Sequence, residues 1–160
     1  MHDVPSMMTM AQTTRTDDTK TKFTADERAA VKEYAKELQT AAKRKGKATR
    51  KDGELDIQEK IAAMPEPDRS MAARVHELVL AAVPELFPTT WYGMPAYAMD
   101  GKTICFFQPA SKFKARFSTL GFSDKANLDD GDMWPVYYAL NALTPEVEQR
   151  ITELVRRAAG

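Results

Sequence analysis

The sequence predicts an α+β fold, in which an antiparallel sheet of about five strands has helices packed on one face and a further helix before it. Three observations carry this prediction. Asp100-Gly101 lies between two apolar, aromatic runs, which is typical of a two-residue hairpin. Helical apolar spacing precedes these runs, and Thr144-Pro145-Glu146 marks the start of a last helix after them.

The first part of the chain predicts a tail and one helix. Residues 1–22 are polar and rich in Thr, so we expect a disordered tail. Thr24 and Glu27 have the spacing of a capping box, which predicts a helix over residues 25–44. Its apolar positions recur at helical spacing as a thin stripe of Val31, Tyr34, Leu38 and Ala42.

A basic segment, Lys43–Gly53, follows this helix and predicts a linker. Residues 20–51 hold 11 Lys and Arg against 4 Asp and Glu, although the whole chain has a net charge of zero. We therefore divide the chain into a tail (1–22), an amphipathic helix with a basic linker (23–53) and a domain (54–160). The basic segment would supply phosphate contacts, but no nucleic-acid-binding motif accompanies it, so nucleic acid binding is not expected.

The domain itself begins with two predicted helices. One starts near Glu54 and ends before Pro65, and the next starts at Glu66-Pro67-Asp68. Pro84 and Pro88 end the second one. Its core-facing stripe comprises Met71, Val75, Leu78, Val79 and Ala82.

Strands make up most of the remainder. We expect them at about 89–92, 96–99, 102–108 and 115–120, with Gly93-Met94-Pro95 as a kink between the first two. A polar excursion, 121–132, separates them from a short strand at about 135–139. The buried face of the last helix is predicted to comprise Val147, Ile151, Leu154 and Val155.

Composition places few limits on function. The chain has 160 residues, 43% of them hydrophobic, and no run approaches the roughly 18 apolar residues of a membrane span. Its single cysteine, Cys105, excludes an intramolecular disulfide and fits a reducing, cytoplasmic location. Cys105 lies mid-strand, where a cysteine acts as a small hydrophobe, and His76 is predicted at the edge of its helix stripe as a structural or solvated residue. No nucleotide-binding or nucleophile motif occurs.

Residues from about Asp56 to Ala158 resemble the YdhG-like bacterial domain family. The resemblance lies in Trp91-Tyr92-Gly93-Met94-Pro95-Ala96-Tyr97, in Ile61–Glu66 and in Lys112-Phe113. Some members of this family are described as frataxin-like intracellular iron chaperones. The resemblance therefore implies a non-enzymatic binding or carrier protein that holds iron through exposed helix carboxylates. The helices of this chain would supply Glu59, Glu66, Asp68, Glu77 and Glu85.

A hard-cation site is an alternative. Asp124, Asp129, Asp130 and Asp132 gather in one loop, and oxygen ligands suit Ca²⁺, Mn²⁺ or iron. The spacing is not that of an EF-hand, and acidic loops commonly serve solubility alone. A zinc site is not expected, because one Cys and one His inside the domain cannot build a closed site of nitrogen and sulfur ligands.

A second alternative uses the aromatic residues of the strands. Adjacent pairs such as Trp91-Tyr92 and Phe106-Phe107 point to both faces of a strand, so the face without helices would carry rings. Such a face would form a ligand groove or a homodimer interface, with Lys112, Lys114 and Arg116 as a cationic rim. The candidate ligand-binding residues are Trp91, Tyr92, Tyr97, Lys112 and Trp134.

Overall fold

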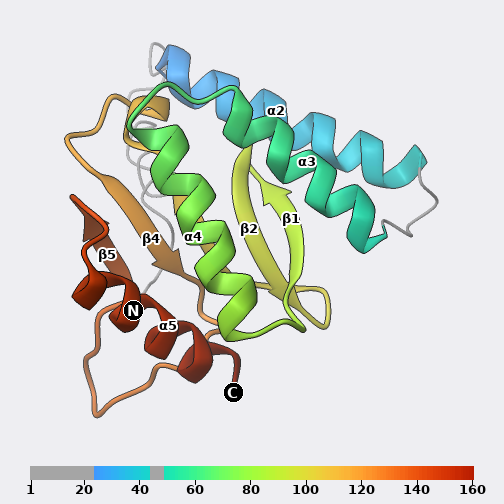
Figure 1. Cartoon of the computed structure of the whole chain (residues 1–160). Helices are drawn as coiled ribbons and strands as arrows, with labels where there is room; N and C mark the ends of the chain where they lie inside the picture. Colours follow the sequence, from blue (N-terminus) through green and yellow to red (C-terminus); the bar gives the residue numbers. More distant parts are fainter. Residues whose placement is uncertain (1–23, 44–48) are drawn as a thin grey trace.

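The computed structural model describes residues 24–43 and 49–160. This part of the chain contains four α-helices and one five-stranded antiparallel sheet, which confirms the α+β class (Figure 1). The strand order, β1-β2-β3-β4-β5, is also the chain order, so each strand pairs with its neighbour in sequence. The predicted tail, 1–22, and most of the predicted linker lie outside the described residues.

The strands lie close to their predicted positions, and the third has the predicted bounds. They are β1 (Phe87–Trp91), β2 (Met94–Met99), β3 (Lys102–Gln108), β4 (Ser118–Phe122) and β5 (Tyr137–Leu140). A short 3₁₀ helix, η1 (Ala110–Lys112), joins β3 to β4. Asp100 and Gly101 both have positive φ, so the predicted β2–β3 hairpin turn is confirmed.

The four helices are α2 (Ala25–Lys43), α3 (Arg50–Ala62), α4 (Asp68–Ala82) and α5 (Pro145–Ala159). Figure 1 shows α4 crossing the front of the sheet, α5 beside it and α2 behind α3. None of the described helices is long and apolar enough to cross a membrane.

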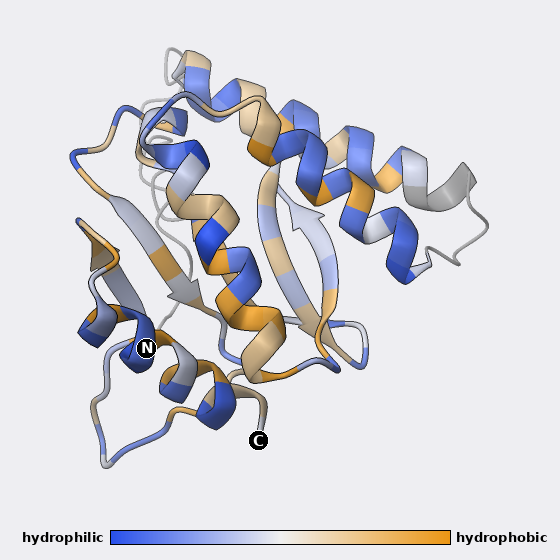
Figure 2. Ribbon diagram, viewed as in Figure 1, coloured by the Kyte–Doolittle hydropathy of each residue, from blue (hydrophilic) through white to orange (hydrophobic). Residues whose placement is uncertain are grey.

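The larger core lies between the front face of the sheet and α3, α4 and α5. Alternate strand residues, among them Tyr97, Cys105 and Phe107, meet the apolar faces of these helices there. The second half of α4 is its hydrophobic part, as Figure 2 shows. Burial of Val75, Leu78 and Val79 confirms the centre of the predicted α4 stripe.

A smaller core lies on the second face of the sheet, and α2 covers it. Ala30 of α2 is fully buried against Met94, Ala96 and Phe106. The capping box of α2 is confirmed, because Thr24 and Glu27 exchange backbone-to-side-chain hydrogen bonds of 3.0 Å. Two members of the predicted apolar stripe, Val31 and Leu38, are exposed, whereas Tyr34 stacks on Tyr92. The side chain of Ala42 lies outside the described part of the structure. This helix is held mainly by polar side chains, which hydropathy periodicity cannot detect.

The start of α3 differs from its prediction. Thr49 caps the helix and forms a capping box with Asp52, so Arg50–Gly53 are helical and not part of a linker. Gly53 suits this place because a Cβ there would lie 1.8 Å from the carbonyl oxygen of Pro88 in β1. The sequence predicts a linker here because a basic run that ends in glycine is typical of one.

The predicted kink at Gly93 is instead a second hairpin turn. Trp91 pairs with Met94, and the two residues between them, Tyr92 and Gly93, have φ of 55° and 78°. A tyrosine in this conformation is uncommon. Its ring stacks on Tyr34 of α2 at a centroid distance of 4.3 Å, which stabilises the turn against that helix.

Candidate functional site

The five candidate ligand-binding residues do not lie in one place. Trp91, Tyr92 and Lys112 lie near α2, on the second face of the sheet. Tyr97 is fully buried in the larger core on the opposite face. Trp134 lies in the loop before β5, beside α5. The predicted single aromatic groove is therefore not assembled from these residues.

The aromatic rings on the second face pack mostly against one another. Trp91 meets Phe106 edge to face at 5.1 Å, and Phe106 meets Tyr137 at 6.1 Å. Phe106 also fills the space over Gly121, where a Cβ would lie 2.3 Å from its ring. These rings form the interior of the smaller core rather than an open ligand face. A homodimer through this face stays a prediction.

The predicted cationic rim is largely neutralised. Lys112 forms an ion pair with Glu33 at 2.5 Å, and Lys114 forms one with Asp26 at 3.2 Å. The guanidinium group of Arg116 lies 5.2 Å from the ring centroid of Phe117. Both lysines therefore form ion pairs that connect α2 to the segment after β3.

A polar groove of about 400 Å³ runs between α2, α3 and β1. Its lining comprises Glu33, Tyr34, Lys36, Glu37, Leu38, Thr40, Asp56, Glu59, Lys60, Thr89 and Thr90. Glu33 bridges Lys60 and Lys112, while Glu37 accepts hydrogen bonds from the backbone N–H groups of Tyr92 and Gly93. Burial raises the pKa of Glu37. Three of the charged groups in this groove thus hold α2 in place.

The candidate metal ligands in the acidic loop lie apart. Asp129, Asp130 and Asp132 are exposed. Across residues 24–43 and 49–160, no group of three or more His, Cys, Asp or Glu side chains is placed to hold a metal ion. Asp130 instead lines a cavity beside α5.

The helix carboxylates implied by the family resemblance are also dispersed. Glu66 pairs with Arg69, and Glu77 pairs with Arg74. Asp68 is buried and accepts hydrogen bonds from the Ser111 backbone and the Ser118 hydroxyl. Only Glu59 and Glu85 are exposed without a described ion pair. These five carboxylates do not form one acidic surface.

One polar group escaped the sequence analysis. His76 is buried, with 6% of its surface exposed, and its Nδ1 lies 2.9 Å from the Tyr97 hydroxyl. Its Nε2 lies 2.9 Å from both carboxylate oxygens of Glu54. The three side chains connect α3, α4 and β2, and His76 gives both Tyr97 and Glu54 a hydrogen-bond partner. The predicted edge position of His76 is wrong, because the residue is buried and hydrogen-bonded on both ring nitrogens.

The thiol of Cys105 is in an environment that disfavours reactivity. Cys105 is fully buried, and burial raises its pKa to about 12. A nucleophilic cysteine needs the thiolate form and some exposure. The prediction of a small buried hydrophobe at this position is confirmed.

The most distinctive cavity is what we call the α5 pocket, a cavity of about 280 Å³ between α5 and the loop before β5. Trp134 and Tyr138 are half-buried and pack against the larger core. The lining comprises Leu128, Asp130, Trp134, Pro135, Tyr138, Arg150, Glu153, Leu154 and Arg157. The pocket therefore combines aromatic rings with charges of both signs.

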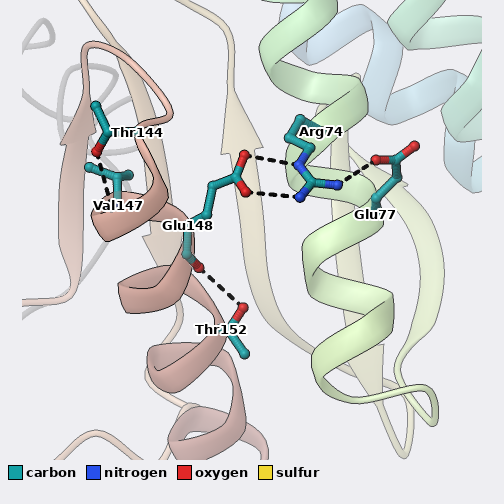
Figure 3. A network of polar contacts seen from close by, with 6 residues as sticks. All are labelled: Arg74, Glu77, Thr144, Val147, Glu148 and Thr152. Carbon is teal, nitrogen blue, oxygen red and sulfur yellow. Dashed lines mark hydrogen bonds and ion pairs between the residues drawn. The ribbon is translucent and has the colours of Figure 1, made fainter.

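Helix α5 forms a fixed wall of this pocket. The Thr144 hydroxyl accepts a hydrogen bond from the Val147 backbone and caps the helix, as predicted. Arg74 of α4 donates two hydrogen bonds to Glu148, of 2.9 and 2.8 Å, and a further one to Glu77 (Figure 3). Ile151 and Val155 anchor the inner face of the helix in the core, which confirms the predicted face.

The opposite wall is also fixed. The backbone N–H of Asn127 donates to the Ala158 carbonyl at the end of α5, at 2.9 Å. Leu128 is 3% exposed. The Tyr138 hydroxyl donates to the Pro135 carbonyl at 3.3 Å, and its ring meets Phe122 edge to face. The cavity is thus formed before any ligand enters.

The arginines of the pocket make no ion pair within the described chain. Arg150 lies over the Tyr138 ring at 5.5 Å from its centroid, a cation–π distance. Neither Arg150 nor Arg157 has a described carboxylate within 4.0 Å. Glu153 and Asp130 likewise have no described basic partner. All four charged residues are exposed to solvent.

No known protein-family model, no curated protein and no solved structure matches this sequence.

Proposed function

We propose that this chain is a non-enzymatic small-molecule-binding protein whose ligand occupies the α5 pocket. One observation carries the proposal: two guanidinium groups without ion-pair partners stand beside a half-buried Trp134–Tyr138 wall in a cavity that the fold keeps open. Small-molecule sites are typically concave, with apolar and aromatic walls and a few convergent polar groups.

The size of the cavity favours a small ligand. About 280 Å³ is near the lower end of ligand pockets, which span roughly 300–1,000 Å³. Because both walls are fixed by packing and hydrogen bonds, the ordering cost of binding falls mainly on the exposed charged side chains.

The lining favours binding over catalysis. Its side chains include no Ser, Thr, Cys, His or Lys, which supply most nucleophiles and bases. Its two carboxylates, Asp130 and Glu153, belong to exposed residues. Exposed carboxylates of this kind suit recognition of a charged ligand more than proton transfer.

The resemblance to the YdhG-like family implies another function, intracellular iron carriage. This hypothesis rests on the resemblance alone, because the expected carboxylates are dispersed over the described surface. An anaerobic Fe²⁺ titration by calorimetry, with Mn²⁺ and Zn²⁺ as controls, tests it. Saturable micromolar Fe²⁺ binding that is lost on Glu59→Gln would favour iron carriage over our proposal.

Tryptophan fluorescence tests the proposal directly. The chain has two tryptophans, so Trp91→Phe leaves Trp134 as the only fluorescent indole. We expect at least one member of a panel of small aromatic acids, amines and amino acids to change this emission saturably. Double substitution of Arg150 and Arg157 by Met should weaken that binding by about ten-fold or more.

Arg156 supplies the matched control. It is exposed on the same helix and does not line the pocket. Arg156→Met removes one positive charge from the same helix but outside the pocket, so it should leave the affinity within about two-fold. If no compound binds, or if Arg156→Met weakens binding as much as the double substitution does, the proposal is wrong.

A further inference from the structure

We infer that the ligand of the α5 pocket is a small zwitterion that carries a carboxylate and an ammonium group beside an aromatic or apolar group, as a free amino acid does. This inference rests on the proposed function and concerns the chemical class of ligand. The observation that carries it is the arrangement of four charges without described partners around one aromatic wall.

The positive charges of the pocket both come from α5. Arg150 and Arg157 are seven residues apart on α5, so they share a helix face and their Cα atoms lie roughly 10 Å apart. Leu154 lies between them with 8% of its surface exposed. The apolar part of a ligand can therefore pack on Leu154 while its carboxylate contacts one of the arginines.

The negative charges belong to different elements. Glu153 lies on α5 between the two arginines, and Asp130 lies on the facing loop. Glu153 and Arg157 have the i, i+4 order that favours an ion pair on a helix. No such pair forms in the described structure, so the carboxylates keep their capacity to accept hydrogen bonds from a ligand ammonium group.

This charge pattern discriminates among ligand classes. A purely anionic ligand would pair with the arginines but would be repelled by Asp130 and Glu153. A purely cationic ligand would pair with these carboxylates but would be repelled by the arginines. A zwitterion matches both sets of exposed charges, the arginines with its carboxylate and the carboxylates with its ammonium group.

The aromatic wall selects what the zwitterion carries. Trp134 and Tyr138 present ring surface beside Leu128 and Leu154. Ring–ring contact contributes about 0.5–1.5 kcal/mol beyond area burial. We therefore expect aromatic amino acids to bind more tightly than small aliphatic ones.

Calorimetry with chemically matched probes tests the inference on the full chain. The probes are L-phenylalanine, phenylalaninamide, which lacks the carboxylate, and N-acetyl-L-phenylalanine, which lacks the ammonium group. We expect L-phenylalanine to bind and each derivative to bind about ten-fold or more weakly, because each loses one set of charge-assisted hydrogen bonds.

Two pocket variants connect each ligand charge to its protein partner. Arg157→Met should weaken binding of L-phenylalanine but not of phenylalaninamide. Glu153→Gln should weaken binding of L-phenylalanine but not of the N-acetyl derivative. Arg156→Met serves as the charge-matched control, and thermal unfolding confirms that each variant folds.

The outcomes separate this inference from the proposed function. Equal affinity of N-acetyl-L-phenylalanine and L-phenylalanine would mean an anion site and would overturn the zwitterion. Equal affinity of phenylalaninamide would overturn it in favour of a cation site. In both cases the small-molecule function stands. If none of the standard amino acids binds but another compound of the panel does, only the zwitterion is wrong. If nothing binds, both proposals are wrong.

Discussion

At the scale of single residues, two tyrosines with buried hydroxyl groups differ in whether the hydroxyl has a hydrogen-bond partner. The Tyr97 hydroxyl contacts His76 at 2.9 Å inside the larger core. The Tyr137 hydroxyl is buried without any hydrogen-bond partner in the described structure, and burial raises its pKa to about 12. The first hydroxyl should stabilise the fold, whereas the second should not.

Removing each hydroxyl tests this contrast. Tyr97→Phe leaves His76 without its Nδ1 partner, so we expect the free energy of unfolding to fall by about 1–3 kcal/mol. Tyr137→Phe removes an unsatisfied group, so unfolding should change by less than about 0.5 kcal/mol or the protein should gain stability. Urea denaturation measures both. Equal losses in the two variants would contradict this assignment.

Two glutamates on α2 should respond to pH in opposite directions. Burial raises the pKa of Glu37 above its ordinary value of 4.5. Ionised Glu37 therefore reduces stability at neutral pH, and this penalty disappears as pH falls through the raised pKa. The stability of wild type relative to Glu37→Gln should thus rise as pH falls through the raised pKa of Glu37.

Glu33 is the internal control. Burial opposes its ionisation, but hydrogen bonds and charge from Lys112 and Lys60 outweigh burial and lower its pKa. Its contribution is present above the ordinary pKa and is lost as pH falls through the lowered one. Glu33→Gln should therefore destabilise the protein at neutral pH, with a deficit that vanishes in acid. Urea denaturation at several pH values measures both variants, and stability differences that change in the same direction with pH would contradict the prediction.

The sequence predicts residue environments where they depend on local pattern. Thr24, Thr144 and Cys105 have the environments expected from their neighbours in sequence. His76 and Tyr97 are 21 residues apart, and only the packing of α4 on β2 joins them. Tertiary packing also decides that Trp91 and Trp134 lie in separate places, which their positions in the sequence do not show.

At the scale of elements, the contact of α3 with β1 depends on one glycine. Ala usually stabilises a helix interior by about 0.5–1 kcal/mol relative to Gly. At position 53, however, the added Cβ would lie 1.8 Å from the Pro88 carbonyl oxygen, and a backbone atom cannot give way cheaply. The close approach should outweigh helix propensity.

We therefore expect Gly53→Ala to destabilise the protein by about 1–3 kcal/mol, which is the usual cost of overpacking. Leu55→Ala in the same helix is the control, since Leu55 is 58% exposed and should change stability by less than about 0.5 kcal/mol. Thermal denaturation measures both variants. A more stable Gly53→Ala protein would show that α3 does not contact β1 this closely.

Elements with strong local signals are predictable, and elements held by polar contacts are less so. The Asp100-Gly101 turn, β3 and α5 all have the predicted bounds or lie close to them. The face by which α2 docks is different from the predicted one, because Glu33 and Glu37 bind partners that are distant in sequence. The β1–β2 turn was read as a kink because a positive φ at Tyr92 has no sequence signal.

At the scale of the whole molecule, α2 belongs to the folded unit. It buries Ala30 against Met94, Ala96 and Phe106, and it holds the β1–β2 turn through Glu37. Deleting residues 1–48, which keeps the Thr49 cap of α3, would expose this smaller core. We expect a cooperative unfolding transition around the larger core, with a lower free energy of unfolding and a lower midpoint in urea.

An unchanged urea midpoint would mean that α2 does not contribute to the stability of the rest of the chain, in agreement with the predicted domain at 54–160. Complete loss of the transition would mean that the larger core cannot fold alone, which would contradict the division into two cores. Circular dichroism during urea denaturation distinguishes these results.

The α5 pocket is the whole-molecule feature on which the functional account depends, because three segments, the loop before β5, β5 and α5, build it together. The most direct test is a calorimetric titration of the full chain with L-phenylalanine, repeated with Arg150 and Arg157 both replaced by Met. The account predicts saturable binding that the double substitution weakens about ten-fold or more and that Arg156→Met leaves unchanged. Absence of binding by every amino acid and every other compound of the panel, or binding that survives the double substitution, would contradict it.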